Sequence, residues 1–427
     1  MTSRMKVFAI LLSLFLLAVL VRAGAGMQVG LSAPLTEDEP EYYVPARSLA
    51  EGRGYCKVEQ QSADGVERPT AYRMPLPSMV MAAVFKVAGG AGISTARWTS
   101  IVISALSAPL MWLFARQAMP RFPALLAGVG CAIYPTWVHA ASMILSEPYF
   151  IPAMLAALIL SVRAARSKTW PWALAAGLAW SVAALIRPHA LVMGGAIGLL
   201  EARHSRVRAA IFLAAIFSLL LPWAIRNQIR FGHPVLLATE GGETLLGANN
   251  PYVLSDRQLH GMWLSPLKVP GYNQRLSSVH DDIERDHLQS SLAWAFLRSH
   301  PDQIPRLIAY KLERWLTPIT VTGGAVRLMV LGSYGVLLVL LAGGGLLGVF
   351  KPNAALGYVV LCSLILTVFT IVYWGGLTRG RLPLEILWLP WGAQAGWEFV
   401  RYVGRGFSSE RAGGVGMSAT NSKVTVS

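Results

Sequence analysis

The sequence predicts an all-α protein that crosses a membrane several times. Of the 427 residues, 54% are hydrophobic and only 14% are charged, and the mean hydropathy is +0.49. A typical soluble domain has about 25% charged residues, so the chain is too apolar for that class. Uncharged runs of spanning length also recur along the chain, and about 20 apolar residues suffice to cross a bilayer as a helix.

Apolar runs define ten candidate transmembrane helices. They lie near residues 5–23, 93–116, 122–142, 146–165, 170–187, 189–203, 207–226, 326–350, 354–374 and 382–400. The segment 74–90 is ambiguous because it contains Pro75, Pro77 and Lys86. If this segment does not cross, the basic clusters between the other runs all face the cytoplasm, as the positive-inside rule requires. We therefore expect 74–90 to lie as a helix in the outer interface, with both chain termini inside.

The first apolar run, Val7 to Val21, is short for a transmembrane helix. Its 15 residues span about 22 Å at ~1.5 Å per residue, against ~30 Å for the hydrocarbon layer. A cleaved signal peptide is therefore an alternative, since Ala23 and Ala25 follow the run. We favour retention of residues 1–23, because Lys6 and Arg22 can snorkel and no clear A-x-A ending follows.

Two long segments between the apolar runs are expected on the outer side. The first, 24–92, belongs to an N-terminal module of residues 1–226, and the second comprises 227–325. Within the second, GGETLLGANNP (241–251) indicates a turn region, 280–301 predicts a helix stopped by Pro301, and 304–318 predicts an amphipathic basic helix on the membrane surface. Residues 326–405 contain the C-terminal helices, and 406–427, rich in Gly and Ser, are expected to form a disordered cytoplasmic tail.

Charge and motif content exclude several other classes. The net charge of +15 does not indicate nucleic-acid binding, because the basic residues cluster between apolar runs and there orient membrane helices. The three cysteines lie far apart without CxxC spacing, so neither a disulfide nor a cysteine metal site is expected. His139, His189, His233 and His260 lack HxxxH spacing and are expected to be structural. No GxGxxG or Walker motif indicates a nucleotide-binding fold.

The stretch TEDEPEYYVPARSLAEGRGY, residues 36–55, places four carboxylates just after the first apolar run. Pro40 fits the first position of a helix and Gly52 with Gly54 supplies a stop, so Asp38 and Glu39 stand at the start of a short helix. Negative charge there suits the helix dipole. Capping of a surface helix is therefore one interpretation of these acids, and catalysis is the other.

The spacing of this stretch is DExxYxxxAxxLxxGxGY, formed by Asp38, Glu39, Tyr42, Ala46, Leu49, Gly52, Gly54 and Tyr55. It resembles the first outer loop of GT-C glycosyltransferases that use polyprenyl-phosphate sugars, in the protein O-mannosyltransferase and aminoarabinose transferase branch. Later segments resemble that branch in the same order, namely TAYRMPLPSMVMAAVF (70–85), LSEPYF (145–150), LIRPHAL (185–191), PWAIRNQIRFGHPV (222–235), GGETLLGANNP, HPDQIPRLIAYKLERWLTP (300–318) and RGRLPLEILWLPW (379–391). Met74, Met79 and Ala248 depart from the pattern, which leaves the substrate open.

The resemblance implies a GT-C fold with about ten transmembrane helices, interfacial helices in the first outer loop and a large second outer loop. Matched to this sequence, it implies Asp38 as the general base and Glu39 as its neighbour and alternate. Glu147 is expected as a second acid, which either orients the acceptor or completes a charged or metal site with Asp38. Substrate contacts are expected from Tyr42, Tyr55, Asn249 and Asn250.

Four arginines are expected to bind the phosphate of the donor, namely Arg73, Arg187, Arg379 and Arg381. The predicted topology places them at outward ends of helices, where the positive-inside rule does not favour arginine. Guanidinium groups match phosphate oxygens in bidentate fashion, which explains their presence there. Pairing with lipid headgroups is the alternative.

The resulting hypothesis is an integral glycosyltransferase of the inner (cytoplasmic) membrane, transferring a hexose or pentose. It would take the sugar from a polyprenyl-phosphate donor to a glycan, lipid or protein acceptor on the periplasmic or exterior face, with membrane lipids as further partners and no nucleic acid. A divalent cation, Mg or Mn, stays open as a cofactor. A transporter or flippase of lipid-linked sugars is the alternative, because it would use the same arginines without an acceptor base. A non-catalytic scaffold would leave Arg187 and Glu147 unexplained.

Overall fold

The computed structural model describes residues 3–58, 66–318, 324–376 and 378–414, with side chains through 403. Within these ranges the protein is almost wholly helical. The two strands, β1 (Cys56–Val58) and β2 (Glu67–Pro69), form an antiparallel hairpin in which Cys56 lies opposite Pro69. The predicted all-α class is therefore confirmed.

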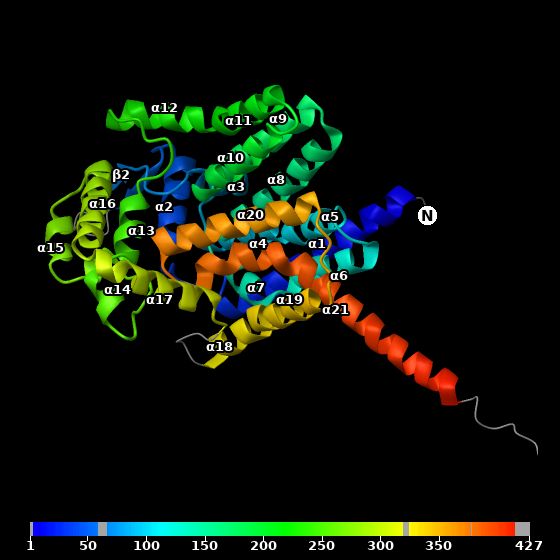
Figure 1. Ribbon diagram of the computed structural model, residues 1–427. Helices are drawn as coiled ribbons and strands as arrows, with labels where there is room; N and C mark the ends of the chain where they lie inside the picture. The colour runs from blue at the N-terminus through cyan, green and yellow to red at the C-terminus, as the bar shows by residue number, and fades with distance from the viewer. Residues whose placement is uncertain (1–2, 59–65, 319–323, 377, 415–427) are drawn as a thin grey trace, which may run out of the picture.

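A bundle of apolar helices forms the body of the molecule (Figure 1). Its members are α1 (Ser3–Val29), α4 (Ile93–Ala105), α5 (Ser107–Ala115), α6 (Arg121–Ile133), α7 (Pro135–Ala141), α8 (Glu147–Ser167), α9 (Trp170–Ala184), α10 (His189–Glu201), α11 (Arg206–Ser218), α12 (Leu220–Phe231), α18 (Gly324–Val330), α19 (Val336–Leu346), α20 (Ala354–Phe369) and α21 (Thr378–Gly414). All ten predicted runs are helical. Among the described residues, five helices are long and apolar enough to cross a membrane, or seven if each of two bent pairs counts once; the predicted count of ten is not confirmed.

Helix breaks explain part of that difference. The α6 and α7 helices meet at Tyr134 with a bend of 50°, and α11 and α12 meet at Leu219 with a bend of 41°. Pro135 occupies the first turn of α7, where a proline can begin a helix but cannot continue the preceding one. Two single π-helical turns, η3 (Leu331–Gly335) and η4 (Thr370–Trp374), interrupt the helices near the C-terminus.

Arg22 corrects one expectation about the first helix. We expected its side chain to snorkel toward water, but it is fully buried in the bundle. Its guanidinium donates to the carbonyls of Cys131 and Ala132 at the end of α6 and to Ser107 Oγ. These carbonyls are freed where α6 stops, so Arg22 satisfies acceptors that a continuous helix would satisfy itself.

The first outer segment is compact and lies against one end of the bundle (Figure 1). It consists of α2 (Glu39–Ala50), the β1–β2 hairpin and α3 (Leu76–Ala88), which packs on α2. The helix predicted for 74–90 is α3. It buries Met81 and Phe85 on one side and leaves the apolar side chains of Met79 and Val87 exposed on the other.

The second outer segment forms a helical layer at the same end of the molecule (Figure 1). It contains α13 (Gly241–Ala248), α14 (Pro251–Ser255), η1 (Pro266–Lys268), α15 (Tyr272–Ser277), α16 (Asp282–Ser299), η2 (Pro301–Gln303) and α17 (Ile304–Leu316). The helices predicted before Pro301 and over 304–318 are confirmed. The turn predicted for 241–251 is wrong, because α13 occupies most of it. Its glycines permit close packing, since a side chain at Gly242 would meet the backbone of Asp286.

The C-terminal helix continues past the predicted start of the tail. The backbone of α21 is helical through Gly414, so the disorder expected from residue 406 does not hold for 406–414. The remaining part of that prediction, 415–427, lies outside the described residues.

Candidate active site

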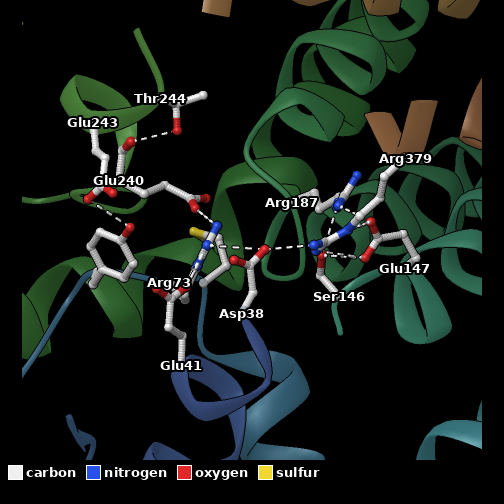
Figure 2. A network of polar contacts seen from close by, with 12 residues as sticks. Asp38, Glu41, Arg73, Ser146, Glu147, Arg187, Glu240, Glu243, Thr244 and Arg379 are labelled. Carbon is white, nitrogen blue, oxygen red and sulfur yellow. Dashed lines mark hydrogen bonds and ion pairs between the residues drawn. The ribbon is translucent and has the colours of Figure 1, made fainter. Parts of the chain in front are cut away.

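Six parts of the chain meet where the outer segments join the bundle. They are the start of α2 with Asp38, the segment 70–73 before α3, the start of α8 with Glu147, the turn before α10 with Arg187, the start of α13 and the start of α21 with Arg379 (Figure 2). Asp38 is the residue before the first turn of α2, so it projects from the end of that helix. Asp38 and Arg187 therefore lie in one cavity.

Arg379 links the two predicted acids. Its Nη1 lies 2.7 Å from Asp38 Oδ2, and its Nε lies 2.6 Å from Glu147 Oε1. Arg187 also contacts Glu147 at 2.8 Å and donates to Ser146 Oγ at 2.8 Å. The Glu147 side chain is fully buried, and that of Asp38 is 36% exposed. Glu147 thus holds both guanidinium groups in place, whereas Asp38 is accessible from the cavity.

Arg73 forms the centre of a second group on the other side of Asp38 (Figure 2). It donates to Glu41 Oε2 at 2.7 Å, forms an ion pair with Glu240, and lies 3.7 Å from Asp38 Oδ2. Tyr72, the preceding residue, donates to Glu243 Oε2 at 3.0 Å. The Arg73 guanidinium therefore faces three carboxylates, two from the start of α2 and one from the start of α13.

These groups line a cavity of about 450 Å³. One wall carries the charged residues described above. Its apolar wall comes from around the start of α10, the end of α20 and η4, with Ile186, Pro188, His189, Leu191, Val192, Phe369, Tyr373 and Trp374. The cavity thus combines a polar centre with an apolar side, as a site for an amphipathic ligand requires.

The surroundings set the protonation of the acids that line the cavity. Burial raises the pKa of Asp38, but Arg73 and Arg379 lower it by a larger amount, so the pKa lies below its usual value. Burial raises the pKa of Glu41 to about 7 despite Arg73, and nearby Asp38 adds to the rise. Burial also raises the pKa of Glu240. At neutral pH Asp38 is therefore a carboxylate, whereas Glu41 holds its proton part of the time.

Several predicted site residues lie outside this cavity. Glu39 is buried against Arg97 at 3.1 Å and accepts hydrogen bonds from the Thr36 and Ile144 amides. Arg381 is buried against Glu385 at 2.7 Å and donates to the Trp315 carbonyl.

The two asparagines and the second tyrosine also lie elsewhere. Asn249 accepts from Lys311 Nζ at 2.8 Å, and Asn250 caps α14. Tyr55 donates to the Arg73 carbonyl at 3.1 Å and lines a neighbouring pocket instead. Of the four residues expected to contact substrate, Tyr42 is the one that lines the cavity.

The cavity also contains residues that the sequence did not single out as site residues, namely Glu41, Glu240, Glu243 and His189. Glu41 stood in the acidic stretch itself. His189 directly follows the Arg187–Pro188 pair, and its position beside a predicted phosphate ligand was the available signal.

His189 has unusual surroundings. Its ring lies between Phe150 and Trp374, with centroids 4.9 Å away in each case, and it is 1% exposed. Within the described part of the chain, its Nε2 has no hydrogen-bond partner. An unmet buried polar atom costs stability, so a group positioned this way favours an added ligand.

The acids do not form a metal site as they are arranged. Among the described residues, no three histidine, cysteine or carboxylate side chains come together to hold an ion. Asp38 and Glu147 both face the Arg379 guanidinium, which occupies the position between them. The residues present therefore do not fit a divalent cation, and no step below depends on one.

Comparison with known proteins identifies part of the chain and its fold. Residues 68–226 match the family model described as dolichyl-phosphate-mannose-protein mannosyltransferase. This range contains Arg73, Glu147 and Arg187, while Asp38 and Arg379 lie outside it. No curated protein matches the sequence.

Among solved structures, the oligosaccharyltransferase of Archaeoglobus fulgidus tethered to an acceptor peptide aligns with a TM-score of 0.54 and 10% identity, over 90% of this chain. Its apo form aligns with a TM-score of 0.52 and 12% identity, over 97% of this chain. The chain has the GT-C fold. The chain spans 49% of the first of those archaeal chains and 53% of the second. ArnT from Cupriavidus metallidurans bound to undecaprenyl phosphate also aligns, with a TM-score of 0.43, 14% identity, and coverage of 92% of this chain and 78% of that one.

Proposed function

We propose that the protein transfers a sugar from a polyprenyl-phosphate donor to an acceptor at the outer face of the cytoplasmic membrane. The observation that carries this proposal is the Asp38–Arg379–Glu147–Arg187 chain of contacts in one cavity. It places a carboxylate beside two guanidinium groups, which are the elements that this transfer needs. The match of residues 68–226 to the mannosyltransferase family model supports the donor class.

The donor phosphate would bind between Arg187 and Arg379. Both side chains line the cavity, and Arg187 adjoins its apolar wall. Leu191, Val192 and Phe369 on that wall would contact the first prenyl units, since apolar surface is stabilised by apolar contact. His189, held between aromatic rings, would supply a further hydrogen bond to a phosphate oxygen.

Asp38 would act as the general base. In the transfer step, an acceptor hydroxyl oxygen forms a bond to the anomeric carbon while the bond from that carbon to the phosphate oxygen breaks. The hydroxyl proton passes to Asp38, and the departing phosphate retains the electron pair, whose charge Arg187 and Arg379 stabilise. A single displacement of this kind inverts the configuration at the anomeric carbon.

Arg379 gives the base a way to respond to the donor. Without donor, its ion pair with Asp38 holds the pKa of that carboxyl low. A bound phosphate would compete with Asp38 for the same guanidinium, so the pKa of Asp38 would rise toward a value suited to a base. Donor binding would thereby prepare the acid for the acceptor.

The direct test incubates the purified full-length protein, in lipid nanodiscs, with a panel of radiolabelled polyprenyl-phosphate hexoses and pentoses and with membranes of the producing cell. Label should leave the lipid carrier and appear in an acceptor fraction. Labelled nucleotide sugars, supplied in parallel, should be inert. Transfer from nucleotide sugars with none from any polyprenyl-phosphate sugar would contradict the proposal.

A further inference from the structure

A second pocket adjoins the cavity on the side of the β1–β2 hairpin and α16. It has a volume of about 100 Å³ and lies between α2, the β1–β2 hairpin, the segment 70–73, η1 and α16. Glu41, Tyr72, Arg73 and Glu243 line both this pocket and the cavity, so these side chains form the wall between them. The hydrogen bond from Tyr72 to Glu243, at 3.0 Å, lies in that wall.

Gln289 supplies this pocket with a polar group that nothing else uses. It lies on α16, is 3% exposed and lines the pocket. Among the described residues, its side-chain amide has no hydrogen-bond partner. Its amide atoms are open to the space of the pocket, where they can donate twice and accept twice. A ligand in the pocket would therefore form hydrogen bonds with the Gln289 amide.

The three cations that the structure describes around the pocket already have partners: Lys57 and Arg73 pair with carboxylates, and Arg285 donates to the Leu276 carbonyl at 3.1 Å. Lys57 forms an ion pair with Asp282, and Arg73 contacts Glu41 at 2.7 Å and pairs with Glu240. A charged ligand would have to displace one of these partners. A neutral ligand that exchanges hydrogen bonds with Gln289 needs no such displacement.

The position of the pocket assigns it to the acceptor. A lipid-linked donor must enter the cavity from the apolar wall formed by α10 and α20, since its prenyl chain belongs in the membrane. The small pocket lies on the other side of Arg73, among the helices of the outer segments. A sugar ring bound there would leave the rest of the acceptor to extend past Arg73 into the cavity that Asp38 lines.

We propose that this pocket binds a neutral, hydroxyl-bearing sugar ring of the acceptor, with Gln289 as its specificity-determining residue. This inference rests on the proposed function only in taking the bound sugar as part of the acceptor. A small closed pocket with polar groups on several walls suits a single ring bearing several hydroxyls. A peptide is usually recognised along a sheet edge or an extended groove, which a pocket of about 100 Å³ does not provide.

The test measures binding without any transfer. The full-length protein in nanodiscs is mixed, without donor, with methyl glycosides of common neutral hexoses, and saturation-transfer NMR records which are bound. Gln289→Met keeps the length of the side chain and removes the amide. Gln274→Met, an exposed glutamine on α15, is the matched control.

At least one hexoside should bind to the parent protein and to Gln274→Met. In Gln289→Met its affinity should fall roughly fivefold, the loss expected for one or two neutral hydrogen bonds. Val58→Phe, which fills the pocket from β1 without altering Gln289, should weaken the same hexoside. Binding of polyprenyl monophosphate should be unchanged in all three variants. Unchanged binding would also show that the variants are folded.

Two results would overturn the inference: no hexoside whose binding depends on Gln289, or a Gln289-dependent signal from the peptide Ala-Ser-Ala instead. The proposed function fails separately. If a hexoside binds as described but no polyprenyl-phosphate sugar is ever consumed, the transfer reaction is wrong while the sugar pocket stands.

Discussion

Asp38 and Glu41 share one cavity, yet their environments shift their pKa values in opposite directions. Burial raises both, but Arg73 and Arg379 outweigh burial at Asp38. At Glu41, burial, Asp38 and Glu243 outweigh Arg73, so the pKa rises to about 7. Two carboxyls near one guanidinium cannot both ionise without cost. Asp38 therefore stays a carboxylate near neutral pH, whereas Glu41 exchanges its proton there.

Glu41 predicts a pH dependence of stability. Its pKa is about 7 in the folded protein, against a usual value of 4.5, so the folded state binds more protons between these values. Stability from this group is then complete below pH about 4.5 and is lost as the pH rises through about 7. In Glu41→Gln, the apparent Tm followed by tryptophan fluorescence should fall less between pH 5 and pH 7.5 than in the parent protein. Glu37→Gln, at an exposed neighbour, should keep the parent slope, and equal slopes in all three would refute the assignment.

His189 predicts an effect on the donor alone. His189→Phe keeps a ring in the aromatic surroundings of Phe150 and Trp374 but removes both nitrogens. The KM for the polyprenyl-phosphate donor should rise roughly tenfold, the loss of one hydrogen bond to a charged group, with Tm unchanged. His189→Asn and His189→Gln each restore an N–H hydrogen-bond donor at this position, so one of these variants should recover part of the rise in the donor KM. An unchanged donor KM in His189→Phe would mean that the ring only packs.

The sequence predicted most of the charged groups of the cavity, but one expected acid lies outside it. Asp38, Glu147, Arg73, Arg187 and Arg379 lie together as expected, and each stands in a segment that resembles the GT-C pattern. Glu39, expected as the neighbour and alternate of Asp38, is buried against Arg97, whereas Glu41 lines the cavity. The two lie about 200° apart around α2 and cannot face the same way. Which of the two faces the cavity depends on how α2 packs against α3 and the bundle. Local residue spacing does not predict that packing.

At the scale of elements, hydropathy located every apolar helix but not the interruptions within them. A window average is insensitive to a bend at Tyr134 or to the π-helical turn η4, since both leave composition unchanged. The glycines of 241–251 were assigned to a turn, whereas they allow α13 to approach α16 closely. Composition alone does not separate a glycine that bends the chain from one that makes room for a neighbour.

One docking contact shows how the outer layer fixes the cavity wall. Lys311 on α17 is 1% exposed, and its Nζ donates to Asn249 Oδ1 at 2.8 Å and to the Ile371 carbonyl at 2.6 Å. Asn249 in turn donates to the Val372 carbonyl at 2.8 Å. These carbonyls belong to η4, which places Tyr373 and Trp374 in the cavity. Asn249 therefore holds η4 in place through this contact.

Lys311 predicts a second pH dependence, of opposite sign. Burial lowers its pKa to about 7 from 10.5, so between these values the folded state binds fewer protons than the unfolded state. Stability from this group should therefore rise with pH above about 7. Lys311→Met should flatten the rise of Tm between pH 7 and pH 9, whereas Lys268→Met, at an exposed site on η1, should not. A parent protein with no such rise would contradict the burial of a charged amine here.

At the scale of the whole molecule, the cavity exists because residues from 38 to 379 converge at one end of the bundle. The order of the motifs implied this convergence, but no motif specifies the distances. Buried polar contacts between distant segments set them. Glu39 joins α2 to Arg97 of α4 and to the Ile144 amide just before α8, which brings Asp38 beside Glu147.

The outward orientation of this end is a prediction from the distribution of basic residues. Single cysteines test it, because Cys56, Cys131 and Cys362 are buried. Ser255→Cys, exposed on α14, should react with a membrane-impermeant maleimide added to intact cells. Lys168→Cys, exposed between α8 and α9, should react only after permeabilisation. The reverse pattern would place the cavity on the cytoplasmic side.

Single-turnover transfer by Asp38→Asn tests the central claim most directly. The amide cannot accept the acceptor proton, so the rate of sugar transfer from a bound polyprenyl-phosphate donor should fall by about 10² to 10⁴. The affinity for the donor should stay within a few fold, because Arg187 and Arg379 remain, and Glu37→Gln should transfer at the parent rate. Movement of the labelled lipid across the bilayer at the parent rate, with no sugar transfer by either protein, would indicate a flippase instead. An Asp38→Asn protein that transfers sugar as fast as the parent would contradict the account.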